Sequence, residues 1–140
     1  MAQPEATAPT PTHAAATITV DSHESHPFEQ SAGPALLEIS ITESFVGDID
    51  GRSTVRALQV RDSTGSASQV SMQRFVGALG GRKGSFVLQG SGTVADGKVN
   101  ASWFVVPGSG TGELFGLRGE GGFAGEFGKG SRGTLDYWFE

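Results

Sequence analysis

Residues Val105–Gly122 read VVPGSGTGELFGLRGEGG, and this stretch decides the fold. It places a proline and a dense run of glycines between apolar residues. Glycine at this density indicates positive φ angles or close backbone approach, and it disfavours a helix. The apolar residues at its edges argue against a disordered linker. The stretch therefore predicts a strand, a glycine-rich turn and a sharply bent strand, as found at the corners of β-barrels.

The rest of the chain also favours strands and turns. Glycine accounts for 22 of the 140 residues, and from residue 36 onward apolar and polar side chains alternate with period two. Asp96–Gly97 is a strong two-residue hairpin signal. Strands are expected over residues 17–20, 36–46, 54–60, 68–79, 85–94, 99–106, 114–117 with 119–124, and 133–140.

About eight strands with short connections predict an all-β fold, an eight-stranded antiparallel up-and-down barrel. Closure removes the unpaired strand edges that promote aggregation. The interior of such a barrel is filled by side chains or holds one small ligand. A β-sandwich is the competing arrangement.

The N-terminal region differs from the rest. Residues 1–16 hold Pro4, Pro9 and Pro11 among alanines and threonines, which predicts a disordered N-terminal tail before a single barrel domain over residues 17–140. Residues 21–33 are polar and are expected to form a loop. The tail has neither a basic start nor a continuous apolar stretch, so we expect a cytoplasmic protein.

Composition narrows the partners. A net charge of −5 and a pI of about 5.1 disfavour nucleic acid, because phosphate binding depends on clustered cations. No apolar run reaches the roughly 18 residues of a membrane helix, so no membrane contact is expected. Cysteine is absent, which excludes disulfides and thiolate metal sites. His23 and His26 form an HxxH pair, but a polar loop is the better interpretation than a metal site.

Two charged residues interrupt apolar strand faces and are the candidate catalytic residues. Glu43 shares a face with Ile39, Ile41 and Phe45, and Arg74 alternates with Val70, Met72 and Val76. An inward charge needs a partner or neutralisation, and a carboxyl in an apolar cavity has a raised pKa suited to acid–base chemistry. The alternative is that these faces point outward and the apolar stripe forms a subunit interface.

Three further residues are candidates for substrate binding. Gln89, Trp103 and Tyr137 each alternate with residues that suit a cavity wall, and each carries one polar group. Ordinary core or interface packing is the alternative for each of them.

The segments Gly81–Val94, Trp103–Gly121 and Leu135–Glu140 together resemble a bacterial family of small uncharacterised proteins with the allene oxide cyclase barrel-like fold. More distantly, Gly108–Gly119 is similar to the glycine-rich turn of plant allene oxide cyclases and dirigent proteins, although Ser109 replaces one glycine. The resemblance implies a barrel open at one end, no cofactor, catalysis by shaping a bound substrate, and trimers in the plant relatives. Glu43 is the only counterpart here of the cavity glutamate of the cyclases.

Three functions are compatible with these features. The first is a cofactor-independent isomerase or cyclase of secondary metabolism that acts on a small hydrophobic molecule, with Glu43 as acid or base and Arg74 or Gln89 orienting an oxygen. The second is a non-catalytic ligand-binding barrel. The third is an interaction module with a filled core, and a homo-oligomer is compatible with each.

Overall fold

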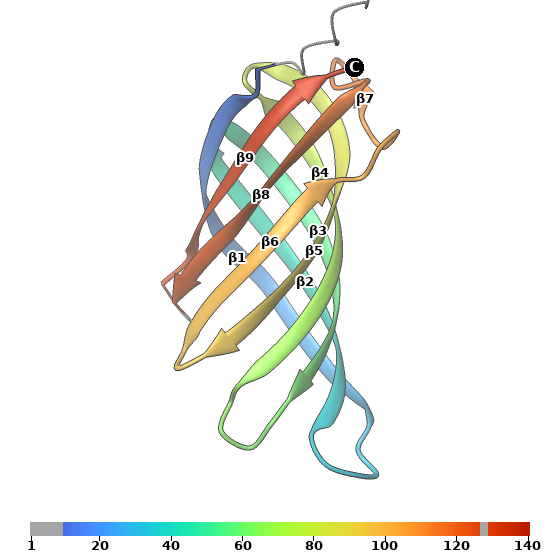
Figure 1. Cartoon of the computed structure of the whole chain (residues 1–140), viewed down its shortest axis with the longest axis vertical. Helices are drawn as coiled ribbons and strands as arrows, with labels where there is room; N and C mark the ends of the chain where they lie inside the picture. The colour runs from blue at the N-terminus through green and yellow to red at the C-terminus, as the bar shows by residue number, and fades with distance from the viewer. Residues whose placement is uncertain (1–9, 127–128) are drawn as a thin grey trace, which may run out of the picture.

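Nine strands form the structure, a computed structural model that describes residues 10–126 and 129–140 (Figure 1). They are β1 (Thr12–Glu29), β2 (Ala35–Gly47), β3 (Ile49–Arg61), β4 (Ala67–Leu79), β5 (Arg82–Ala95), β6 (Lys98–Val105), β7 (Thr111–Gly112), β8 (Leu117–Glu126) and β9 (Ser131–Phe139). Within the described residues there is no helix long and apolar enough to cross a membrane.

The strands close into an antiparallel barrel. Their order is β4-β3-β2-β1-β9-β8-β6-β5, and β4 also pairs with β5, which closes the ring; the two-residue β7 is an addition to β5. The predicted eight-stranded up-and-down barrel is therefore confirmed, and the sandwich is excluded. The Asp96–Gly97 hairpin is also confirmed, since both residues have the positive φ angles of a type I′ turn (53° and 74°).

The glycine-rich stretch covers an edge that β6 leaves free. β6 ends at Val105, so the first residues of β5 extend beyond it. The loop that follows β6 supplies the missing hydrogen bonds: the Glu113 amide donates to the Lys83 carbonyl (2.9 Å), and the Ser85 amide donates to the Thr111 hydroxyl (3.1 Å). The loop thus replaces a strand at this edge, as closure of the barrel requires.

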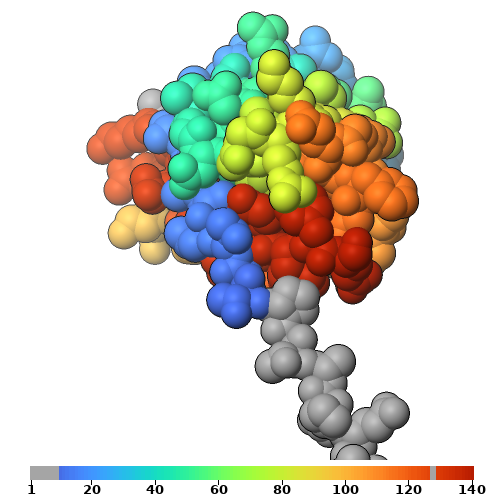
Figure 2. Space-filling model, turned by 90° about the horizontal axis from the view of Figure 1, so that it is seen from above, coloured from blue at the N-terminus to red at the C-terminus, as the bar shows by residue number. Residues whose placement is uncertain are grey.

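The same loop plugs one end of the barrel, called here the closed end. Leu114 lies in the turn after β7 and is fully buried in the core. Gly110 permits this turn, because a Cβ at that position would lie 2.0 Å from the Leu114 carbonyl oxygen. Figure 2 looks down on this end and shows it covered by the β2–β3 and β4–β5 turns, the loop and the C-terminus.

The opposite end, called here the open end, carries two long hairpins, β1–β2 and β3–β4, which extend furthest from the barrel (Figure 1). β9 pairs with β1 only as far as Ile18, so residues 19–29 of β1 pair with β2 alone. We call residues 19–29 the β1 overhang. The expected loop over residues 21–33 is therefore wrong up to Glu29. Its polar side chains reflect a strand exposed on both faces, with bulges at Asp21 and Phe28.

The expected boundary of the disordered tail is also wrong. Residues 12–16 are the first part of β1 and pair with β9. Ala14 and Ala16 are 1% and 2% exposed. Their small side chains pack where β1 contacts the core. Residues 1–9 of that expected tail lie outside the described residues.

Candidate functional site

The interior of the barrel is filled near the closed end and hollow near the open end. The hollow part is a cavity of about 270 Å³, slightly below the range of roughly 300–1,000 Å³ that is usual for drug-sized ligands. Its apolar wall consists of Ile18, Val20, Ile39, Ile41, Val94 and Val99, and its polar lining includes Thr19, His23, Gln59, Arg61, Gln69, Glu126 and Ser131. The cavity therefore suits a small, mainly apolar molecule with one polar end.

A chain of hydrogen bonds fixes the polar groups at one side of the cavity. The Arg61 Nε donates to the Gln59 Oε1 (3.0 Å), and the Gln59 Nε2 donates to the Gln69 Oε1 (2.8 Å). In residues 10–126 and 129–140 no carboxylate forms an ion pair with Arg61; Glu126, which shares the cavity, pairs with Lys129. The Arg61 guanidinium thus keeps its two terminal nitrogens for an oxygen of a ligand.

Glu43 faces the interior, as expected, next to the cavity. It does not line the cavity itself, but its cross-strand partner Val20 and the next residue on its face, Ile41, both do. Burial, together with the smaller effect of the nearby Asp21 carboxylate, raises the pKa of the Glu43 carboxyl to about 7. Asp21 is the extra residue of a β-bulge in β1, and its carboxylate accepts a hydrogen bond from the hydroxyl of Ser44, the residue after Glu43. Glu43 therefore exchanges a proton near neutral pH.

Trp103 and Tyr137 face inward but belong to the filled core. Trp103 is 5% exposed, packs against Phe45 and Phe123, and donates its Nε1 hydrogen to the Thr134 carbonyl (2.9 Å). Tyr137 packs edge-on against Phe139 near the closed end. Neither residue lines the cavity, so the expected placement of these two aromatic rings in a binding wall is wrong.

Arg74 and Gln89 lie on the outside of the barrel. Both are exposed, and the neighbouring Val70, Met72 and Val76 of the same face are 49–58% exposed. The structure shows the outward orientation, which the sequence left open as an alternative: on β4 the inward side chains are those of the other parity, with Gln73 and Phe75 buried. The structure therefore does not bring Arg74 or Gln89 near Glu43.

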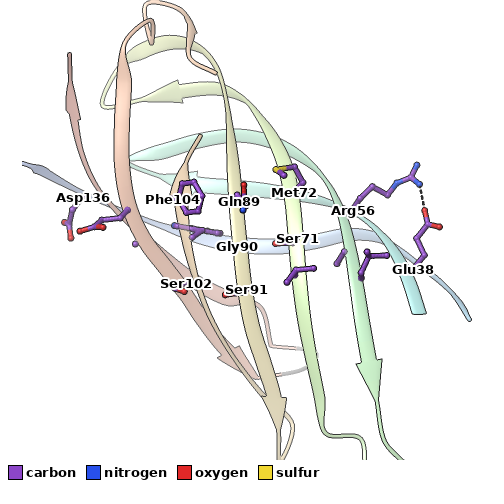
Figure 3. Close-up of a pocket in the computed structure, with 16 residues that line it drawn as sticks. Glu38, Arg56, Ser71, Met72, Gln89, Gly90, Ser91, Ser102, Phe104 and Asp136 are labelled. Atoms are coloured by element: carbon purple, nitrogen blue, oxygen red, sulfur yellow. Dashed lines mark hydrogen bonds and ion pairs between the residues drawn. The ribbon is translucent and has the colours of Figure 1, made fainter. Parts of the chain in front are cut away.

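The outward face carries a second hollow, a broad groove of about 1,090 Å³ that crosses seven strands (Figure 3). Its centre is apolar, formed by Leu58, Val70, Met72 and Phe104, which are all exposed. One end carries the Glu38–Arg56 ion pair (2.9 Å), and the other end carries Glu120 and Asp136. We call this surface the exterior groove.

Comparison with known proteins identifies the family. The family model described as "Protein of unknown function (DUF3224)" matches residues 14–140. The chain belongs to the DUF3224 family. A crystal structure of a DUF3224 protein of unknown function from Shewanella oneidensis is 32% identical, with a TM-score of 0.74 over 93% of this chain and 98% of that chain. No curated protein matches.

Three polar residues that line the cavity of this DUF3224 protein were not predicted from the sequence. The sequence does not single out Gln59, Arg61 and Gln69, because alternation along β4 leaves open which of its faces points inward. The available signal was the parity of β3, where Val55 and Ala57 alternate with Arg52, Arg56 and Leu58. Followed along β3, that alternation points Gln59 and Arg61 inward.

The DUF3224 cavity combines an apolar wall, a cation with free donors and a neighbouring carboxyl that titrates near pH 7. Arg61 can hold an oxygen of a small molecule, and Glu43 can exchange a proton. The two groups lie at different levels of the barrel, because Glu43 is opposite Ser53 on β3 and Arg61 is eight residues further along that strand. None of these steps requires a bound cofactor.

Proposed function

We propose that this DUF3224 protein binds a small apolar molecule in the open-end cavity and isomerises it by proton transfer at Glu43, without a cofactor and in the cytoplasm. The raised pKa of Glu43 beside an apolar cavity carries the proposal. Arg61 and the paired glutamines hold an oxygen of the ligand at the end of the cavity away from Glu43, a role that the sequence predicted for Arg74 or Gln89. The distant resemblance to plant allene oxide cyclases, which also work without a cofactor, supports a cyclase-type or isomerase-type reaction.

The oxygen-orienting role of Arg61 gives a binding prediction. Cyclohexanecarboxylate, cyclohexylmethanol and cyclohexylmethylamine have similar shapes and differ in charge, so NMR titration with these probes separates shape from charge. We expect the carboxylate to bind about tenfold more tightly than the alcohol, since a charge-assisted hydrogen bond contributes about 1.5 kcal/mol or more. Arg61→Gln should remove this preference and leave binding of the alcohol unchanged. Absence of binding by all three probes would overturn the ligand-binding proposal.

Proton transfer is tested separately with an enolisable ketone that fits the cavity. 2-Indanone in D₂O exchanges its α-hydrogens, and NMR follows the exchange without any net reaction. We expect the protein to accelerate this exchange at about pH 8, where Glu43 is largely ionised, and Glu43→Gln to lose at least tenfold of the acceleration while it still binds cyclohexylmethanol. Equal exchange with both proteins would leave a ligand carrier, not an isomerase, as the function.

A further inference from the structure

The exterior groove is independent of the cavity chemistry, because it lies on the other face of the sheet. Its apolar centre leaves four large side chains 43–55% exposed in neighbouring positions: Leu58, Val70, Met72 and Phe104. Isolated apolar residues are normal on a surface, but a contiguous patch with a polar rim marks an interaction site. The charges of the rim differ between its two ends: one end carries the cation Arg56 beside Glu38, and the other carries the carboxylates of Glu120 and Asp136. The partner proposed below is chosen to complement both ends.

The groove is arranged symmetrically about β5. Gln89 of β5 lies directly opposite Met72 on one side and Phe104 on the other. One strand further out, Arg56 lies opposite Met72 (Figure 3). On the other side, Glu120 lies opposite Phe104. Met72 and the cation Arg56 on one side of β5 thus correspond to Phe104 and the anion Glu120 on the other side.

We propose that the exterior groove is the interface of a two-fold homodimer whose axis runs along β5. A two-fold axis in the interface plane places the residues on one side of β5 opposite the residues on the other side of β5 in the partner copy. Met72 then packs on Phe104 of the partner copy, and Arg56 meets Glu120 of the partner copy, twice per dimer. Gln89 lies on the axis and faces its own counterpart.

The neighbouring row fits the same arrangement. Val70 is paired with Leu58 on β4 and β3, and Ser91 and Ser102 continue the row on β5 and β6. Leu58 would face Gly122 of the partner copy, which lies next to Ser102 on β8 and offers no side chain to obstruct it. The bulky residues of one half thus meet the small residues of the other.

The shape of a barrel also permits this contact. Strands of an eight-stranded barrel are tilted by roughly 35–45° from the barrel axis. A two-fold axis along a strand therefore sets the two barrel axes at about 70–90° to each other, twice that tilt. The convex girth of each barrel then lies against the concave waist of its partner, so the two saddle-shaped surfaces match.

Cross-linking tests the position of the axis. The chain has no cysteine, so Gln89→Cys introduces a single thiol. Face-to-face sheets pack about 10 Å apart, and a bis-maleimide with a spacer of about that length should join two Gln89→Cys chains at micromolar concentration. Thr54→Cys is the control: Thr54 is exposed on β3, two strands from β5, so its two copies lie far apart on opposite sides of the axis. Equal cross-linking of both variants, or of neither, overturns the proposal.

Charge reversal tests the pairing of the two ends. By sedimentation equilibrium we expect Arg56→Glu and Glu120→Arg each to raise the dimer dissociation constant at least tenfold, and the double variant to restore it. Met72→Glu should give monomers, because it places a carboxylate on Phe104 of the partner copy. Circular dichroism confirms that each variant is folded. A wild-type protein that is monomeric at about 0.1 mM, or a trimer that these substitutions leave intact, would contradict the proposed dimer.

Discussion

Phe75→Ala is expected to reduce the free energy of unfolding by about 3–5 kcal/mol, the usual cost of truncating a fully buried phenylalanine. Phe75 is 0% exposed and lies at the centre of the aromatic core, with its ring centroid 5.4 Å from that of Phe45 and 5.0 Å from that of Phe86. Three strands contribute these rings, so neighbouring side chains cannot easily collapse into the space that alanine leaves. Since domains of this size are stable by about 5–15 kcal/mol, the variant should be close to its unfolding limit.

Urea unfolding followed by tryptophan fluorescence measures this loss, because Trp103 lies in the same core. Val76→Ala is the matched control: it is the next residue on the same strand, points outward and is 58% exposed. We expect the control to change stability by less than about 0.5 kcal/mol in the monomer. Similar losses at both positions would show that β4 faces the core with the other side.

Glu43→Gln is expected to stabilise the protein by about 3 kcal/mol above pH 7 and to have little effect near pH 4. The carboxyl has an ordinary pKa of 4.5 when unfolded and a pKa of about 7 when folded. Between these values the folded state holds a proton that the unfolded state has released, so stability falls as pH rises from 4.5 to 7 and is then constant. Each pKa unit corresponds to about 1.4 kcal/mol.

The measurement is the free energy of unfolding at pH 4.5, 6, 7 and 8, for the wild type and for Glu43→Gln. The wild-type curve should fall relative to the variant through this window. Glu24→Gln is the control, because Glu24 is an exposed carboxyl on the β1 overhang. A constant difference between wild type and Glu43→Gln at all pH values would mean that Glu43 titrates normally, and the proton-transfer proposal would lose its basis.

Much of the fold could be predicted from the sequence, because turns and alternation are local signals. The Asp96–Gly97 hairpin and the turn from Gly80 follow from residues that favour positive φ angles, and both were found. The β1 overhang could not be predicted in the same way. A strand that is exposed on both faces shows no alternation, so residues 21–29 have the composition of a loop.

The candidate site was harder to predict, because alternation shows that a strand has two faces but not which face is inward. On β4 the outward face is the more apolar one, with Val70, Met72 and Val76, whereas Gln69, Ser71 and Gln73 point inward. The rule that apolar residues face the core fails there, since the hollow end of the barrel tolerates paired amides and the exterior groove is apolar. The inward orientation of Glu43 was predicted correctly, because its neighbours of the same parity, Ile39, Ile41 and Phe45, form the apolar side of β2 that faces the core.

The unequal pairing of the two barrel ends also decides how molecules can enter. At the closed end, the loop after β6 bonds to β5 through backbone and side chains, so a passage there would need several hydrogen bonds and the Leu114 plug to be broken together. At the open end, the β1 overhang is held from one side alone. If the cavity binds a ligand as proposed, fraying of that single ladder would admit the ligand while the ring of strands stays intact, and ligand exchange would not require global unfolding.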